Sequence, residues 1–451
     1  MNFWKRALGV ILFLFGLTAS AGAQTTEPSP RRITLQEAVQ LAVKQNHVVR
    51  MAGFRVQEKE HAKEAARSGY FPSLTNDSRV FTVTDTQFIQ IPAGSLGTSA
   101  GSPIPAQSAI LNQGGRTFVT SHTTLSQPLT QLFTRVKPSN EIAREDLKAT
   151  RANEQETVNA IALRVHQIYY QILATQLRRR ATEARIRAAR DLESERVEQV
   201  KYGSTLDEQL IESRAQTLEA KQDLLNTELQ LSDLTMQLDD VMGVPVTTAL
   251  ELDPAVPEVQ ESCRREDCVK MALASHPGIV AARAEVEKAS AAVRLAKADY
   301  FPEISAFARY SYQHNVPFLA PNFGTFGGQL TYNLFDGGRR LAAVSESSAR
   351  LAQARENLAR ITNEVELRVE TAANKLERTR AMVDVSEEVL TLRAESSRVS
   401  AQQFERGEAL RSQADAALAQ EFNAKALRLA TQLDYVQAHD EMLQALGLTP
   451  Q

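Results

Sequence analysis

The side chains that could do chemistry in this chain are not arranged as a catalytic or metal-binding set. The 451 residues include seven histidines, and no two of them stand three or four positions apart, the spacing at which one helix can present two ligands to a metal ion. No nucleophile motif or glycine-rich phosphate loop is present either. The sequence therefore predicts no catalytic residues, no cofactor and no metal site.

The two cysteines offer a different kind of chemistry. Cys263 and Cys268 flank the short stretch Arg264-Arg265-Glu266-Asp267. An ideal helix holds residues five apart beyond the Cα separation of about 4.4–6.8 Å found in disulfides, so bonding would require a turn there. In an oxidising compartment we expect a structural disulfide, with a free pair as the alternative.

A cluster of arginines lies between residues 178 and 190 and could indicate nucleic-acid binding. Acidic residues interleave with it, and the chain as a whole has a formal net charge of −3. A solvated helix face explains this mixture better, so we expect no nucleic-acid partner. The arginines are Arg178, Arg179, Arg180, Arg185, Arg187 and Arg190, and the acids among and beside them are Glu183, Glu193 and Glu195.

The N-terminus indicates export. Trp4-Lys5-Arg6 is a basic start, an apolar run follows from Ala7 to Thr18, and Ala21-Gly22-Ala23 is typical of a cleavage site. The apolar run is shorter than the ~20 residues that a membrane-spanning helix needs. We expect residues 1–23 to be a secretory signal peptide, with an uncleaved anchor as the alternative.

The rest of the chain repeats itself. Residues 38–72 align without a gap with residues 268–302, and each segment ends in Tyr-Phe-Pro. A second match pairs residues 197–243 with 401–447, which places Gly203 on Gly407. Two internal repeats predict a pseudo-symmetric architecture. We expect a first repeat over residues 24–250, a linker over 251–267 and a second repeat over 268–451.

Each repeat contains two stretches with the alternation of β-strands. They fall at about 73–86 and 117–128 in the first repeat, and at about 303–314 and 327–335 in the second. The intervening residues 87–116 and 315–326 are rich in Gly, Ser, Pro and Ala and are expected to be loops. Strands of about ten residues match the length that spans a bilayer at a tilt.

Four strands cannot close a barrel, which needs about eight or more. A membrane barrel would therefore have to be shared between several chains. The alternative is that the hairpins belong to a soluble domain.

Most of the remaining sequence predicts long helices. Residues 136–202 contain one proline and no glycine, which gives a rod of about 100 Å at ~1.5 Å per residue. Residues 341–406 form its counterpart. Apolar residues recur at spacings of three and four, as in a coiled coil. Each rod ends at a glycine, Gly203 or Gly407, where a helix C-cap favours positive φ.

These features together resemble the TolC family of outer-membrane efflux proteins over nearly the whole mature chain. The resemblance rests on the duplicated opening, the Tyr-Phe-Pro before each hairpin, Asp336-Gly337-Gly338 at a strand-to-helix return, and the two glycine tips. The first repeat departs from the pattern, because Gln127 to Phe133 lacks the Asp-Gly-Gly turn. A differently built corner is expected there.

The resemblance implies a mainly α fold with a transmembrane β-barrel. Each chain of a homotrimer would give four strands to a 12-stranded barrel in the outer membrane, in contact with its lipid, and long helical hairpins to a periplasmic tunnel. The family's implied partners are a periplasmic adaptor, or membrane fusion, protein and an inner-membrane RND or ABC transporter. The implied function is a passive efflux or secretion duct in a Gram-negative cell, without enzyme activity.

The same resemblance assigns roles at the hairpin tips. By position, the residues that would form the adaptor-docking and gating tip are Tyr202, Gly203, Ser204, Phe404, Arg406, Gly407 and Leu410. The candidate gate charges are Asp207, Glu208 and Asp415. For any one of these charges the alternative is an ordinary solvated helix residue.

Two other classes of protein are alternatives to an outer-membrane channel. A periplasmic coiled-coil adaptor would have helical hairpins but no membrane strands, and the two β-hairpins argue against it. An exported hydrolase would need a converging catalytic set, which the sequence lacks. The exported substrate cannot be read from the sequence of a passive duct.

Overall fold

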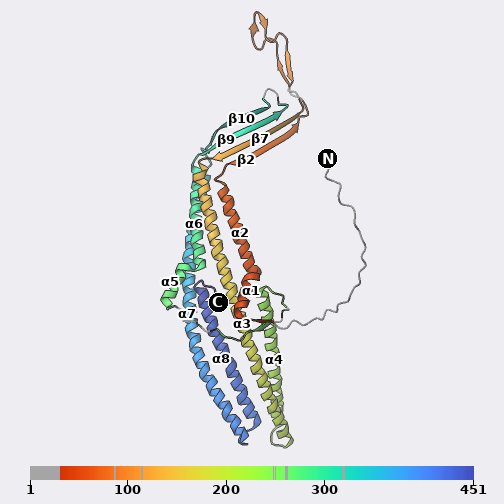
Figure 1. The fold of residues 1–451 in the computed structure, drawn as a ribbon, viewed down its shortest axis with the longest axis vertical. Helices are drawn as coiled ribbons and strands as arrows, with labels where there is room; N and C mark the ends of the chain where they lie inside the picture. Colours follow the sequence, from red (N-terminus) through yellow and green to blue (C-terminus); the bar gives the residue numbers. More distant parts are fainter. Residues whose placement is uncertain are drawn as a thin grey trace, which may run out of the picture.

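The structure is a computed structural model that describes residues 31–85, 88–112, 115–246, 248, 250–257, 259, 263–316 and 320–450. The expected signal peptide, residues 1–23, lies outside the described residues. The described chain is mainly helical and strongly elongated. A four-stranded sheet lies at one end, and two long helical hairpins run to the other (Figure 1).

Two pairs of shorter helices lie in the half of the helical body that is nearer the sheet (Figure 1). They are α1 (Leu35–Gln45) with α2 (His47–Ser68), and α5 (Arg265–Ser275) with α6 (Pro277–Lys297). Asn46 caps α2 by accepting a hydrogen bond from the Val48 amide at 2.8 Å, and His276 caps α6 by accepting from the Gly278 amide at 3.0 Å. Each cap satisfies a donor that has no partner inside its helix, and so fixes the break within the pair.

A disulfide joins Cys263 to Cys268, with the two Cα atoms 5.5 Å apart. Cys268 is fully buried in α5, whereas Cys263 precedes the first residue of that helix. The turn that the pairing requires is therefore the entry into α5.

The long hairpins pair α3 (Lys137–Lys201) with α4 (Asp207–Met242) and α7 (Arg339–Glu405) with α8 (Arg411–Ala445). The longer partners contain 65 and 67 residues, so each extends for about 100 Å. α3 also packs against α2, α6 and α8. It is the helix that joins the two hairpins within the chain.

The main sheet has four antiparallel strands in the order β10-β9-β7-β2. They are β2 (Ser73–Thr82), β7 (Thr117–Pro128), β9 (Glu303–His314) and β10 (Asn322–Thr331). A second, parallel pair, β1 (Arg31–Ile33) with β8 (Leu250–Leu252), ties the start of the described chain to the segment between the repeats.

Two of the expected strand ranges differ from the structure. β2 ends at Thr82 rather than near residue 86, and β10 runs from Asn322 to Thr331 rather than from 327 to 335. The glycines of β10 favoured a loop in the sequence. In the sheet, Gly324 lies opposite Tyr310 and Gly327 opposite Phe307, where an aromatic side chain can cover the gap that a glycine leaves.

The two strand-to-helix corners are built differently. In the second half, Asp336 accepts hydrogen bonds from the Gly338 amide at 3.1 Å and from Arg340 Nε at 2.7 Å, so its side chain organises the turn. In the first half, a π-helical segment (η1, Leu132–Val136) leads directly into α3. There the Thr130 hydroxyl accepts from the Ile304 amide at 2.9 Å.

The expected loop at residues 87–116 contains further strands. β3 (Phe88–Ile91) pairs with β6 (Ala109–Asn112), and β4 (Thr98–Ser99) pairs with β5 (Ser102–Pro103). We call residues 88–112 the ribbon. It projects beyond the main sheet at the end farthest from the helices (Figure 1). Its short strands escaped the sequence analysis because glycines and prolines separate them.

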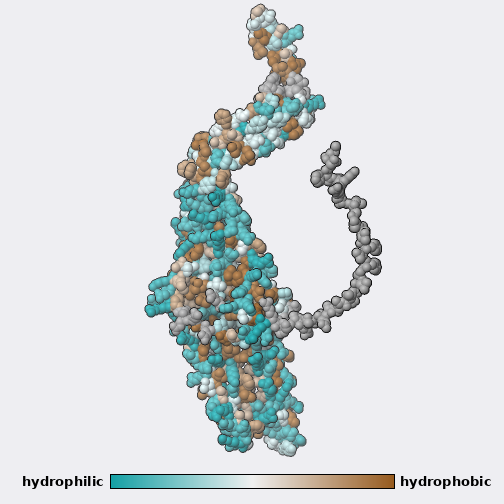
Figure 2. Space-filling view, viewed as in Figure 1, coloured by the Kyte–Doolittle hydropathy of each residue, from teal (hydrophilic) through white to brown (hydrophobic). Residues whose placement is uncertain are grey.

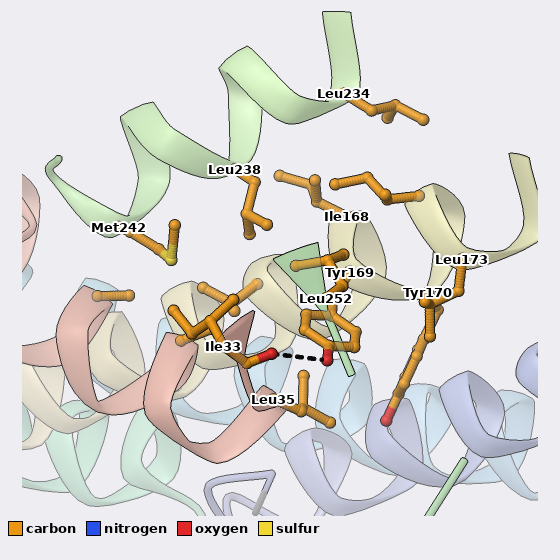
Figure 3. Packing of buried hydrophobic residues seen from close by; sticks show 14 of the residues in the cluster. Ile33, Leu35, Ile168, Tyr169, Tyr170, Leu173, Leu234, Leu238, Met242 and Leu252 are labelled. Atoms are coloured by element: carbon orange, nitrogen blue, oxygen red, sulfur yellow. Dashed lines mark hydrogen bonds between the residues drawn. The ribbon is translucent and has the colours of Figure 1, made fainter. Parts of the chain in front are cut away.

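The main hydrophobic core lies where α1, α3, α4 and the β1-β8 pair meet. Ile33, Ile168, Leu238 and Met242 are almost fully buried there (Figure 3). The Tyr169 hydroxyl donates to the Ile33 carbonyl at 3.2 Å and to the Asp253 carbonyl at 2.9 Å. This residue therefore joins α3 to both short strands from inside the apolar cluster.

A buried polar group joins α3 to α8. His166 Nδ1 lies 2.7 Å from Asp440 Oδ2, and the Tyr170 hydroxyl donates to the same oxygen at 3.3 Å. Burial acts to raise the pKa of Asp440, but hydrogen bonds from His166 and His439 outweigh it and lower that pKa. Asp440 is therefore an ionised acceptor, and it fixes the lateral position of the second hairpin on the first.

None of the helices in the described part of the chain combines the length and the apolar character that crossing a membrane as a helix requires.

Asp239, near the end of α4, is fully buried, and neither carboxylate oxygen has a hydrogen-bond partner among the described residues. Burial raises its pKa to about 6. Because the folded pKa lies above that of the unfolded chain, this group's stabilising contribution is fully present near pH 4 and is lost as the pH rises through about 6.

We predict that Asp239→Asn stabilises the protein at pH 8 by about 1–3 kcal/mol, because the amide is neutral whereas the buried carboxyl, with its pKa raised to about 6, is ionised at that pH. The gain should shrink below pH 5. Thermal unfolding in detergent, followed by circular dichroism at both pH values, measures it. Asp240→Asn changes the exposed neighbour and serves as the control. Equal shifts in the two variants would contradict the assignment.

Candidate functional site

The main sheet has two chemically distinct faces. The register places every Asp, Glu and Arg of the four strands on one side, which we call the charged face. These residues are Asp77, Arg79, Glu303 and Arg309. The other side, the uncharged face, presents exposed apolar and aromatic side chains, which are Leu74, Val80, Leu125, Tyr310, Tyr312, Phe326 and Leu330.

The charged face is also the better covered side of the sheet. Phe118, Ser311 and Gln313 lie on it and are buried. Its polar groups are paired across strands: His122 Nδ1 lies 3.0 Å from Ser311 Oγ, and Arg309 Nε donates to Thr124 Oγ1 at 3.1 Å. The division is one of charge. Phenylalanines also lie on the charged face, and a hydrogen-bonded group of Asn76, Ser78, Ser121 and Thr123 lies on the uncharged face. Charges confined to the covered side, with exposed apolar and aromatic groups on the other, match the pattern of a wall between water and lipid.

The helical body carries an apolar stripe on each flank, on helices that lie on opposite sides in Figure 1. On α4 the exposed residues Ile211, Leu218, Leu225, Leu229 and Met236 follow one another at spacings of seven or four. On α7 the exposed residues are Met382, Val385, Val389, Leu392 and Val399, with spacings of three, four and seven. We call these the α4 stripe and the α7 stripe. Both have the heptad spacing of a coiled-coil seam. They stay exposed in the described part of the chain, and Met382, Val385 and Val389 of the α7 stripe border a groove that Leu427 and Thr431 of α8 also line.

The two hairpin tips lie together at the far end of the molecule (Figure 1). Gly203 and Gly407 have φ values of 71° and 74°. The amide after each glycine bonds back to the preceding helix, Ser204 to Gln199 at 2.8 Å and Glu408 to Gln403 at 2.8 Å. The two turns thus have the same geometry, and the positive φ explains why glycine occupies both positions.

The residues expected to form the tip lie on the surface of these turns. Tyr202, Phe404 and Leu410 are exposed, as are Ser204 and Arg406. This leaves apolar and aromatic side chains in water at the very end of the helical body. Exposed apolar groups that gather in this way are typical of a surface that binds another protein.

The three candidate gate charges fall in two different settings. Asp207 and Glu208 are exposed in the first turn of α4. A negative charge there stabilises the helix because it lies at the positive end of the helix dipole, so these two acids have a structural role independent of any gate. Asp415 is instead partly covered. Its Oδ2 atom lies 3.6 Å from Arg411 Nε on the same helix. Burial and the neighbouring Asp191 carboxylate raise the pKa of Asp415.

Sequence reasoning missed the contact that joins the two hairpins near the tip. Glu195 Oε1, on α3, accepts a hydrogen bond from the Ser412 amide in the first turn of α8 at 2.8 Å. Leu410 stands at the N-cap of α8 and has no side-chain oxygen to accept this bond. Glu195 therefore caps the other hairpin's helix. The only signal for this contact in the sequence is the apolar residue at the N-cap of α8. It does not indicate which residue elsewhere in the chain supplies the missing capping oxygen.

Within the described part of the chain, no group of three or more His, Cys, Asp or Glu side chains is arranged to hold a metal ion. The site consists of surfaces: a two-faced sheet, two apolar stripes and a double tip.

The fold is that of known outer-membrane channels. The Campylobacter jejuni channel CmeC matches with a TM-score of 0.75 and 13% sequence identity, over 98% of this chain and 94% of that one. A Pseudomonas aeruginosa membrane protein matches with a TM-score of 0.73 and 17% identity, over 92% and 90%. The open-state Neisseria gonorrhoeae channel MtrE gives 0.70 and 16%, over 92% and 89%.

No curated protein matches the chain by sequence. The sequence does match the family model described as outer membrane efflux protein, over residues 268–448, which begin at Cys268 and include β9, β10 and the second long hairpin. Residues 268–448 therefore match the outer membrane efflux protein family, and the chain has the fold of outer-membrane channels.

Proposed function

We propose that the protein is the outer-membrane channel of a multicomponent efflux or secretion system. Three copies would form a 12-stranded barrel in the outer membrane and a helical tunnel in the periplasm. The tunnel tip would dock on a periplasmic adaptor protein joined to an inner-membrane RND or ABC transporter. In this role the protein is a passive duct and performs no reaction.

The observation that carries this proposal is the division of the main sheet into two faces. In a barrel of three sheets, the charged face would line a water-filled lumen and the uncharged face would meet lipid. The sheet is also open: β2 and β10 each have one paired neighbour among the described strands. In a membrane those free backbone groups need partners, and β10 of the next copy can supply them to β2.

Aromatic side chains support the same placement. Tyr70, Phe71, Tyr300 and Phe301 are exposed where the helices meet the sheet. Such residues gather at the boundary between lipid and water in membrane barrels. The uncharged face would therefore begin at this level and extend away from the helices.

The stripes on the flanks explain how copies would associate in the periplasm. The helices α4 and α7 lie on opposite sides of the body in Figure 1, so the exposed α4 stripe of one copy would pack on the exposed α7 stripe of the next. Contacts between two different patches form a closed ring when the rotation per copy permits. Three copies suit the four strands that each chain contributes.

The tip would be both the docking surface and the gate. Tyr202, Phe404 and Leu410 offer the exposed apolar contacts that an adaptor could cover. The bond between Glu195 and Ser412 holds the start of α8 against α3. Moving the second hairpin away from the first would break this bond, so we assign it to the closed state.

We predict that the protein extracted from outer membranes in mild detergent is an elongated particle of three chains. Leu225→Asp, in the middle of the α4 stripe, should abolish or strongly weaken the trimer, because a charge would be buried in the seam. Light scattering coupled to size-exclusion chromatography measures the mass. Asn226→Asp adds the same charge on the exposed neighbouring residue and should leave the trimer intact. A soluble monomer of the unchanged chain would favour a periplasmic adaptor instead.

We predict that Glu195→Ala makes the channel open more often. A capping bond contributes about 0.5–2 kcal/mol, so the ratio of open to closed states should rise about two- to thirtyfold. Single-channel recording in planar bilayers gives this ratio. Glu198→Ala is the matched control, because Glu198 is exposed and pairs only with Lys201 on its own helix. An unchanged ratio of open to closed states in Glu195→Ala would mean that the bond between Glu195 and Ser412 does not hold the channel closed.

A further inference from the structure

The ribbon has a composition unlike the rest of the surface. Between Asp85 and Arg116 the sequence contains no Asp, Glu, Lys or Arg, although 23% of the whole chain is charged. In Figure 2 the ribbon is mostly brown and white, whereas the helical body is largely teal. Several large apolar side chains of the ribbon are exposed, namely Phe88, Ile89, Leu96, Ile104, Ile110 and Leu111.

These side chains are ordered by the strand pairing. Ile89 lies opposite Leu111, and Ile91 lies opposite Ala109. Cross-strand partners point to the same side, so these four residues form one face that is apolar throughout, which we call the apolar ribbon face. The opposite face is mixed: Phe88 and Ile110 are exposed on it, and Gln90 on the same face donates to Ser108 Oγ at 3.3 Å. The apolar ribbon face differs in presenting no polar side chain.

A ribbon of this kind needs a cover. Two strands alone are at best marginally stable in water, and no other strand of the described chain pairs with β3 or β6. The apolar ribbon face is therefore a contact surface whose partner lies outside the single chain.

We propose that this partner is the ribbon of the other copies, so that three apolar ribbon faces meet over the outer mouth of the barrel. This inference rests on the trimer proposed above. The ribbon continues the hairpin of β2 and β7, and β2 is one of the edges proposed to join neighbouring copies. Three ribbons would therefore rise from one rim.

The absence of charge favours contact between copies over other partners. Around a three-fold axis each residue approaches its own copies, so any charged residue would meet two like charges. A segment of 30 uncharged residues avoids that repulsion entirely. Anionic lipid headgroups would instead be bound through Lys or Arg, which this segment lacks. Joined in this way, the ribbons form a cap that limits entry from outside.

Cysteine cross-linking on whole cells tests the cap. The native cysteines are bonded to each other, so an introduced cysteine reacts alone. With an oxidant added, Ile89→Cys should yield covalent dimers, because one cysteine per chain can join two of three copies. Leu111→Cys, on the same face, is a second variant in case the first fails to fold. Gln90→Cys, exposed on the opposite face, is the matched control and should remain monomeric.

The detergent mass measurement separates the two proposals. A trimeric particle in which neither Ile89→Cys nor Leu111→Cys forms dimers would overturn the cap and leave the channel standing. A particle that is not trimeric would overturn both. Equal dimer yields from Gln90→Cys and Ile89→Cys would also overturn the assigned face. In addition, Ile89→Asp with Leu111→Asp should increase the entry of a bulky antibiotic that intact outer membranes exclude, while efflux is retained.

Discussion

The unpaired backbone of two strand edges is the constraint on which the proposed assembly depends. β2 and β10 are the edge strands of a four-stranded sheet, which has too few strands to close into a barrel by itself. Water can satisfy such edges on a soluble protein, but lipid cannot. With one uncharged face toward lipid, the sheet is complete only when each edge pairs with another copy. A barrel shared between copies, its lumen and the position of the charged face follow from that requirement.

The helices also call for neighbouring copies, through exposed apolar side chains rather than through unpaired backbone groups. The α4 stripe and the α7 stripe leave apolar seams open on both flanks, so association of the helices and pairing of the strands demand the same neighbours. Inside each copy, the buried contact between His166 and Asp440 joins the two hairpins, and Tyr169 joins the first hairpin to Ile33 and Asp253. These buried polar contacts lie near the middle of each copy.

Much of this arrangement could be predicted from the sequence because it is periodic. The alternation along β2, β7 and β9 and the heptads of the long helices are local patterns, and the glycines at the tips mark turns with positive φ. β10 was placed too late because Gly324, in the expected loop, resembles a turn residue until Tyr310 opposite it is known. The bond from Glu195 to Ser412 joins residues 217 positions apart. No local pattern specifies such a contact, and the same holds for the buried carboxylate of Asp239.

In the proposed channel, the contacts at the tip, which must break when the channel opens, differ in kind from the contacts along the flanks, which must persist. In the proposed trimer, the flanks would associate through repeated apolar seams, whose many contacts would add up to a permanent association. Near the tip the hairpins are joined through a single capping bond and by Asp415 beside Asp191, two carboxylates that repel each other when both are ionised. Such a junction is weak enough for a docking protein to separate, since covering the exposed apolar residues of the tip could supply more free energy than one capping bond. A trimer held by apolar seams along its helices and by few polar contacts at its tip would be able to open at the tip and remain a trimer.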